Sequence, residues 1–180
     1  MPDFQTATTF LALLTLFAAA SALALGGLRV AAALGAPRGW QAVSDAVGPS
    51  ALLLAWLVAL TSTLGSLYYS EVVGLVPCVL CWYQRIAMYP LVVLLGIAAL
   101  RGDPGVRRYA LPLAAIGAAI ALGHYALEWA PVEQTAACDA EAPCGVPSFR
   151  EFGFVSIPFM ALSGFALVAT LLLTPAREER

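Results

Sequence analysis

Residues 77–108 read PCVLCWYQRIAMYPLVVLLGIAALRGDPGVRR, and this stretch decides the fold class. Its centre, Ile86 to Leu100, is uncharged but holds only fifteen residues. A helix rises about 1.5 Å per residue, so these residues reach about 22 Å, whereas the core of a bilayer is about 30 Å thick. The helix is therefore predicted to begin near Pro77, a residue suited to a first helical turn, which places Arg85 about two turns inside a membrane span.

Composition places the rest of the chain in the same environment. Of 180 residues, 61% are hydrophobic and 11% are charged, against roughly 45–50% and about 25% in ordinary soluble domains. A chain of this size cannot enclose so much apolar surface, so the solvent around it must itself be apolar. Four further uncharged stretches are long enough to cross a bilayer: Phe4–Leu28, Ala46–Ser70, Tyr109–Leu127 and Phe152–Ala176. The sequence predicts an all-α integral membrane protein, and its net charge of -2 argues against nucleic-acid binding.

The distribution of arginine predicts the orientation. The loop from Arg101 to Arg108 contains three Arg residues, and short cytoplasmic loops are enriched in positive charge. Alternating the spans outward from this loop places residues 29–45 and the C-terminal tail in the cytoplasm. The N-terminus, residues 71–84 and residues 128–151 then lie outside, and seven of the nine Arg residues lie inside.

The first span is predicted to be a membrane helix and not a cleaved signal peptide. A signal peptide has a positive start and an apolar stretch of about 7–15 residues, whereas residues 1–10 carry an acid and a longer apolar stretch follows them. The two longest exposed loops are predicted at residues 29–48 and 128–151.

All four cysteines fall on the predicted outer side, where disulfides persist. Four cysteines allow three pairings, and two local pairs, Cys78/Cys81 and Cys138/Cys144, are the economical choice. Structural staples are the simplest interpretation of both pairs. A C-x-x-C closes too small a ring to restrict the unfolded chain much, so redox chemistry is favoured for Cys78/Cys81. A thiol in the first turn also meets the positive end of the helix, which favours the reactive thiolate.

Metal chemistry is an alternative for these cysteines. Two Cys pairs can form a four-sulfur zinc site, but zinc needs persistent thiolates and this face is oxidising. Covalent haem attachment is disfavoured because Trp82, and not His, follows Cys81. We therefore expect no metal.

Two further polar residues lie at a similar predicted depth. Arg85 follows Cys81 by four residues, so it lies on the same helical face one turn deeper, where a charge needs a partner. Snorkelling of Arg85 to the headgroups is the alternative. His124, the only histidine, lies one turn before the outer end of its span, where it is either a polar tip at the water boundary or a ligand-binding group. Together, Arg85 and His124 could donate to the two ends of a quinone-like ring.

The run PCVLCWYQRI at residues 77–86 resembles the signature of the DsbB/BdbC family, membrane thiol oxidases that pass electrons from periplasmic or extracellular dithiol proteins to a quinone. The second Cys pair in the next outer loop and the sequence VSIPFMAL at residues 155–162 belong to the same resemblance. It covers about residues 50–173.

The resemblance implies a four-helix transmembrane bundle, to which this chain adds one N-terminal transmembrane helix. The predicted division is an extra helix with a cytoplasmic loop at residues 1–49 and a thiol oxidase domain at residues 50–180. The resemblance further implies that Cys78/Cys81 is the quinone-coupled pair, with Cys81 nearest the quinone and Arg85 at the quinone site. The quinone is expected to be ubiquinone or menaquinone.

The same resemblance implies a partner and a location. Cys138/Cys144 is the pair expected to meet a thioredoxin-like, DsbA-like dithiol oxidase outside the cell membrane. His124 is similar in placement to a quinone-site His in some members, whereas Gln84 stands where many members have Glu. The protein is expected in the bacterial cytoplasmic (inner) membrane, with its N-terminus and both Cys pairs outside and its C-terminus in the cytoplasm.

The expected function is therefore a thiol:quinone oxidoreductase that supports disulfide bond formation. A non-enzymatic membrane scaffold, stapled by two disulfides on its outer face, is the competing hypothesis. A carrier that brings reducing electrons outward is disfavoured, because the chain has no cysteine on the predicted cytoplasmic side from which to load.

Overall fold

The computed structural model describes residues 3–130 and 143–174. In this part of the chain the regular secondary structure is helical, apart from one isolated antiparallel bridge between Glu151 and Val155. The helices are α1 Phe4–Ala33, α2 Pro37–Val47, α3 Ala51–Leu67, α4 Val79–Arg101, α5 Arg107–Leu127 and α6 Ile157–Leu172. Three short turns complete them: η1 Gly48–Ser50, the π-helical η2 Tyr68–Val72 and η3 Pro104–Val106. The prediction of an all-α protein is confirmed.

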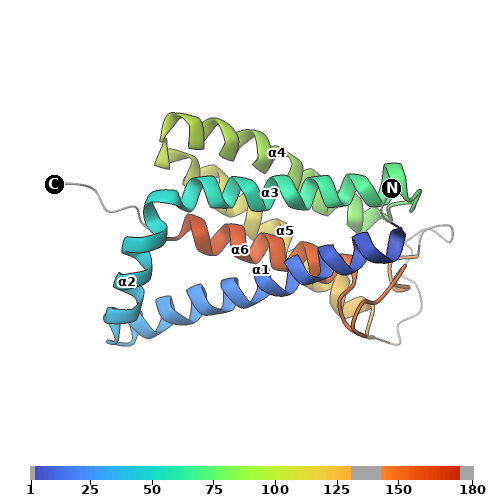
Figure 1. Ribbon diagram of the computed structural model, residues 1–180, viewed down its shortest axis with the longest axis horizontal. Coiled ribbons are helices and arrows are strands. Elements are labelled where there is room, and N and C mark those ends of the chain that lie inside the picture. The colour runs from blue at the N-terminus through green and yellow to red at the C-terminus, as the bar shows by residue number, and fades with distance from the viewer. Residues whose placement is uncertain (1–2, 131–142, 175–180) are drawn as a thin grey trace.

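The five longer helices run along the long axis of the molecule, and α2 crosses one end of them (Figure 1). α6 lies in the middle, where it packs against α1, α3 and α5. α4 packs against α3 and α5. The start of α4, with its two cysteines, lies at the end opposite α2, which we call the cysteine end of the bundle (Figure 1).

The helices have the length and composition of membrane spans. Among the described residues, four helical segments are long and apolar enough to cross a bilayer: Phe4–Ala33, Pro37–Val72, Val79–Arg101 and Pro104–Leu127. The fifth, α6, is apolar but has 16 residues, or about 24 Å of helix. It lies in the middle of the bundle, between longer helices that are long enough to cross the membrane.

The last span is shorter than Phe152–Ala176, the range predicted for it. Glu151 and Val155 exchange two backbone hydrogen bonds of 2.9 Å, and Phe152 adopts a positive φ of 54°, so residues 151–155 form a tight turn. α6 begins only at Ile157, with Pro158 in its first turn. The absence of charge shows that a stretch could lie in a membrane, but it does not distinguish a helix from a turn made of apolar residues.

The predicted loop at residues 29–48 is also wrong, because most of it is helical. α1 continues past Arg29 to Ala33, and α2 follows after a short turn. The Arg29 guanidinium donates to the carbonyl oxygen of Leu173 at 2.5 Å and stacks over the Trp40 ring at 5.8 Å. The Arg29 charge therefore lies at the end of the bundle, and α1 continues past it.

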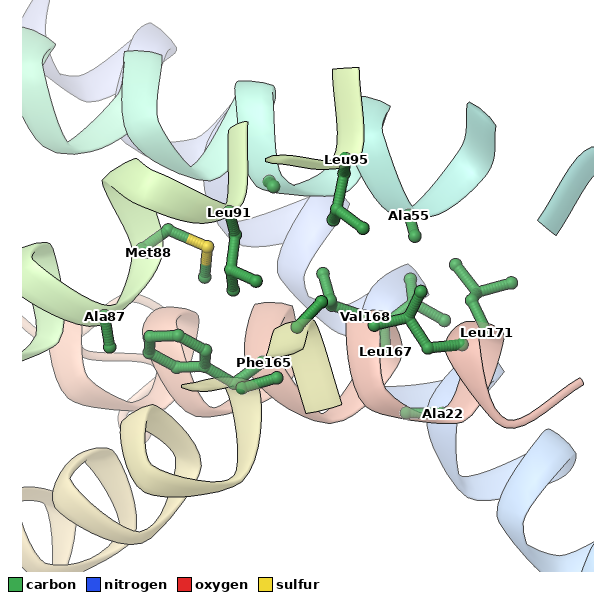
Figure 2. Packing of buried hydrophobic residues seen from close by; sticks show 14 of the residues in the cluster. Ala22, Ala55, Ala87, Met88, Leu91, Leu95, Phe165, Leu167, Val168 and Leu171 are labelled. Carbon is green, nitrogen blue, oxygen red and sulfur yellow. The ribbon is translucent and has the colours of Figure 1, made fainter. Parts of the chain in front are cut away.

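The core combines large buried side chains with buried alanines (Figure 2). Phe165 and Val168 of α6 pack with Leu91 and Leu95 of α4, and all four are fully buried. Membrane helices approach closely where small residues recur on one face. Fully buried alanines do so on α3 and α5, at positions Ala51, Ala55 and Ala59 and at positions Ala110, Ala114 and Ala121.

Gly117 is needed for the contact between α5 and α6. A Cβ at this position would lie 2.3 Å from the ring of the fully buried Phe165. We expect Gly117→Ala to lower the thermal unfolding midpoint in detergent by several degrees, since overpacking a core costs typically about 1–3 kcal/mol. Gly123→Ala is the matched control on the same helix, because a Cβ there meets nothing within 4 Å. Equal midpoints for the two variants would contradict this packing.

The N-terminal helix is part of the bundle and does not stand apart from it. α1 packs along α6 and against α2. The predicted division between residues 1–49 and 50–180 stays a prediction.

Candidate functional site

The C-x-x-C motif forms the beginning of α4. Cys78 is the N-cap residue, and its Sγ accepts a hydrogen bond from the backbone N–H of Cys81 at 3.3 Å. The two sulfur atoms are 2.9 Å apart, and both residues are free thiols. Pro77 directly precedes the N-cap, so the helix starts where the sequence predicts. An N–H group of the first turn thus points at the Cys78 sulfur, which favours its thiolate.

His124 joins the motif to the rest of the site. It is buried on α5, and its Nδ1 accepts a hydrogen bond from the Gln84 amide at 3.0 Å. The proton therefore resides on Nε2, which lies 3.1 Å from the carbonyl oxygen of Cys144 and 3.7 Å from the Cys78 sulfur. The imidazole is thus a buried donor between two cysteines, and not a polar tip at the water boundary.

Gln84 fixes the tautomer of His124. Its side chain is buried, and the amide N–H donates to Nδ1, so Nε2–H is left to point at the cysteines. The sequence drew attention to Gln84 only as a departure from Glu. Its position three residues after Cys81, inside an apolar span, is the signal that could have marked it as a site residue.

Arg85 has the partner that a charge inside a span requires. Its Nε donates to Ser66 Oγ and its Nη2 donates to the Ser66 carbonyl oxygen, both at 3.0 Å. The guanidinium also lies 5.4 Å from the centre of the Trp82 ring, a cation–π contact. Ser66 belongs to the last turn of α3, where the helix dipole favours a cation. These contacts hold Arg85 against α3, so it does not simply extend to the membrane surface.

Cys144 belongs to the same cluster. It is buried and disulfide-bonded, and its carbonyl oxygen faces Nε2 of His124. One imidazole therefore separates the loop cysteine from the C-x-x-C. Cys138, the partner predicted for Cys144, lies outside the described residues. The structure brings the other five predicted site residues together at the cysteine end: Cys78, Cys81, Arg85, His124 and Cys144.

Glu128 is a site residue that the sequence reasoning missed. It follows His124 by one turn, and its Oε2 accepts a hydrogen bond from Ser156 Oγ at 2.5 Å. Burial raises the pKa of this carboxyl above its ordinary value, against the lowering effect of the Ser156 hydrogen bond. A carboxyl with a raised pKa beside His124 is suited to exchange protons as nearby thiols change state.

A cavity of about 930 Å³ begins at this cluster. Cys78, Cys81, Arg85 and His124 line it at the cysteine end. From there it is lined mainly by apolar side chains of α1, α3 and α6. The arrangement places a thiol pair and a cation at the polar end of a long apolar space.

The Cys78, Cys81 and His124 ligand atoms also lie within 4.8 Å of one another, as a metal site would require. Tetrahedral zinc takes four ligands, and no fourth His, Cys, Asp or Glu of the described residues joins this group. The expectation of no metal stays a prediction, which metal analysis of the purified protein tests.

The contacts of Cys78 predict how the pair titrates. Hydrogen bonding from Cys81 lowers the pKa of the Cys78 thiol well below its usual range, and the hydrogen bond to His124 lowers it further. We expect His124→Ala to raise this pKa, because the thiolate loses an N–H donor. The pH dependence of thiolate absorbance in the reduced protein measures it.

Two features make that titration specific. A background in which Cys138 and Cys144 are alanine leaves only the motif thiols to titrate. Tyr125→Phe, at the next position of α5, is the control, because its hydroxyl donates to the Phe154 carbonyl oxygen and not to a cysteine. If His124→Ala and Tyr125→Phe titrate alike, His124 does not stabilise the Cys78 thiolate.

Comparison with known proteins places this site in a family. The chain matches the family model described as disulfide bond formation protein DsbB over residues 49–174, which include the motif, Arg85, His124 and Cys144. The chain belongs to the DsbB family. The resemblance predicted from residues 77–86 is thereby confirmed. α1 precedes the region that DsbB proteins share.

Individual DsbB relatives agree with this assignment. Disulfide bond formation protein C of Bacillus subtilis is 48% identical over 118 residues, which cover 65% of this chain and 86% of the relative. A probable disulfide formation protein of Deinococcus radiodurans is 48% identical over 137 residues, covering 71% and 89%. A protein of the same description from Metapseudomonas resinovorans is 49% identical over 129 residues, covering 71% and 90%. No solved structure gives a significant match.

Membership of the DsbB family supports a role in disulfide bond formation, and with it an oxidoreductase activity. The apolar helices and the family together indicate a multi-pass membrane protein.

Proposed function

We propose that the chain is a membrane thiol:quinone oxidoreductase that reoxidises a thioredoxin-like, DsbA-like dithiol protein. Electrons enter at Cys138/Cys144, pass to Cys78/Cys81 and leave to a membrane quinone, ubiquinone or menaquinone. The observation that carries this proposal is the position of the Cys78/Cys81 pair, which lies between the disulfide-bonded Cys144 on one side and a long apolar cavity on the other.

The proposed orientation puts the cysteine end on the outer face of the bacterial cytoplasmic membrane. The N-terminus and both Cys pairs then lie outside, and the C-terminus lies in the cytoplasm. The three Arg residues at the end of α4 and the start of α5 support it, because positive charge favours the cytoplasmic side. An oxidising outer face also suits a protein that generates disulfides.

In the first step a thiolate of the reduced partner attacks Cys138 of a Cys138–Cys144 disulfide. A mixed disulfide forms and Cys144 leaves as a thiolate, which takes a proton or reacts on. The second partner thiol then attacks the mixed disulfide. The partner thus loses two electrons and two protons, and the loop pair gains them as two thiols.

In the second step Cys144 attacks Cys78 of a Cys78–Cys81 disulfide, and Cys81 leaves as a thiolate one turn before Arg85. Attack at Cys78 is supported by the contacts of His124, whose Nε2–H faces both the Cys144 carbonyl and the Cys78 sulfur. Cys138 then attacks the Cys144 sulfur of this mixed disulfide and Cys78 leaves as a thiolate, which restores the loop disulfide. Glu128 and His124 are placed to take up the protons released as the motif is reoxidised.

The residues at the polar end of the cavity fit a quinone. A quinone, when bound, accepts two electrons and two protons. Arg85 offers a guanidinium that Ser66 and Trp82 hold in place, and the apolar lining behind it suits a lipid-soluble molecule. Arg85 and Cys81 lie on one face of α4, so the chain holds a cation and a thiol toward the same end of the cavity.

Purified protein tests this function in a turnover assay with a reduced thioredoxin-like protein and a soluble quinone analogue. Loss of quinone absorbance should require both the dithiol protein and the membrane protein, and the dithiol should become a disulfide. If the dithiol is not oxidised and both disulfides resist brief thiol treatment, the protein is a stapled scaffold and the proposal is wrong.

A further inference from the structure

One face of α1 forms a wall of the cavity, although α1 lies before the region shared with the DsbB family. The residues of this face are spaced alternately by three and four positions, as on one side of a helix. They are Leu11, Leu14, Ala18, Ser21, Leu25 and Leu28. From Leu11 to Leu28 the face extends over seventeen residue steps, or about 26 Å. The cavity therefore follows α1 through most of the thickness of a bilayer.

The other walls come from α3 and α6. α3 presents Leu57, Thr61 and Gly65, and α6 presents Ala161 and Gly164. α6 packs against both α1 and α3, so it forms the floor between them. At the end opposite the cysteines, the cavity reaches Val43 and Val47, which lie near the C-terminal end of α2.

The hydroxyl groups along the walls do not make the space polar. Thr15 of α1 donates to the Leu11 carbonyl oxygen and Thr61 of α3 donates to the Leu57 carbonyl oxygen, each at 2.8 Å. Both hydroxyls are thus satisfied within their own helices. What faces the cavity beyond Arg85 is mainly hydrocarbon.

α1 is held in place at both of its ends. At the cysteine end, Gln5 and Thr9 donate to the carboxylate of Glu151, at 3.1 Å and 2.8 Å. At the other end, Arg29 donates to the Leu173 carbonyl oxygen at 2.5 Å. The helix is therefore fixed beside the cavity and does not float loosely in the lipid.

We propose that α1, with α3 and α6, forms a channel for the polyisoprenyl tail of the quinone. The inference rests on the proposed function, because the cavity is continuous with the polar end at Cys81 and Arg85. A volume of about 930 Å³ lies at the upper end of the range for ligand pockets, about 300–1,000 Å³. A quinone ring alone would leave most of it empty, whereas a long, flexible chain of isoprene units matches its length and its apolar lining.

The channel predicts which quinones depend on α1. Ala18→Phe places a ring in the channel, and we expect it to raise the KM for long-tailed ubiquinone or menaquinone at least about tenfold, the equivalent of about 1.4 kcal/mol. The KM for the tailless ubiquinone ring or for menadione should change less than about twofold, or roughly 0.4 kcal/mol on the same scale. Ala20→Phe is the matched control, because Ala20 is exposed and does not line the cavity.

A second measurement needs no variant. Wild-type protein is illuminated with a quinone that carries a photoreactive group at the end of its tail, and the labelled peptides are identified by mass spectrometry. Label in residues 4–33 is expected. Label confined to other helices, or equal effects of Ala18→Phe and Ala20→Phe, overturns the channel. If bilayer phospholipid fills the space, Ala18→Phe raises the KM for long-tailed and for tailless quinones by the same factor, and the channel is again rejected.

These outcomes separate the channel from the function on which it rests. Wild-type protein that reduces neither long-tailed nor tailless quinone contradicts the proposed function itself. Wild-type protein that reduces both, while Ala18→Phe leaves the ratio of their KM values unchanged, contradicts only the role of α1.

Discussion

Cys81→Ala is expected to lower quinone-dependent dithiol oxidation by at least about a thousandfold, because it removes one of the two sulfurs between which the second disulfide must form. The two motif sulfurs are 2.9 Å apart and lie at the polar end of the cavity. Cys78 is the other free thiol of the described residues, and alone it cannot form the motif disulfide. Turnover of a thioredoxin-like dithiol in the presence of a soluble quinone measures the loss.

A double variant, Cys138→Ala with Cys144→Ala, is the control for this loss. It should no longer oxidise the protein dithiol, but a small dithiol such as dithiothreitol can still reduce the motif directly, so quinone reduction by dithiothreitol should continue. Cys81→Ala should lose both reactions. Full-rate turnover by Cys81→Ala would show that the C-x-x-C is not on the electron path.

Arg85→Leu is expected to raise the KM for quinone by about tenfold to a hundredfold. A hydrogen bond to a charged group contributes about 1.5–3 kcal/mol, and each 1.4 kcal/mol is a factor of ten in affinity. The loss should appear in KM more than in kcat if the guanidinium binds the quinone ring without taking part in disulfide exchange. Steady-state kinetics with varied quinone at saturating dithiol measures both constants.

Arg101→Leu provides the matched control. Arg101 is exposed in the last turn of the same helix, at the end away from the cysteines. Its replacement removes the same charge and should leave the KM unchanged. If Arg85→Leu has no larger effect than Arg101→Leu, then Arg85 does not bind the quinone and its contacts with Ser66 are structural only.

Features set by neighbouring residues were predictable from the sequence. The start of α4 near Pro77 was predictable, although Pro77 precedes the N-cap Cys78, and the register of Cys81 with Arg85 follows from the helical repeat. The sequence also required a partner for Arg85, because a charge in a span is costly. It could not identify Ser66, which lies on another helix and is brought near by the packing of α3 against α4.

Features set by packing were not predictable. The contact of Gln84 with His124 depends on how α4 meets α5, and the position of Glu128 depends on the turn that carries Ser156. The role of α1 as a cavity wall depends on its docking along α6. Counting charges also failed at the start of the last span, because residues 152–155 of the tight turn are uncharged.

The path of electrons to a quinone is tested most directly by an experimental density map of the protein purified with its native quinone. The proposed function predicts the quinone ring between the Cys81 sulfur and the Arg85 guanidinium, and the inferred channel further predicts the tail along α1, between α3 and α6. A quinone ring bound at any other place in the protein, out of reach of Cys81, would contradict it.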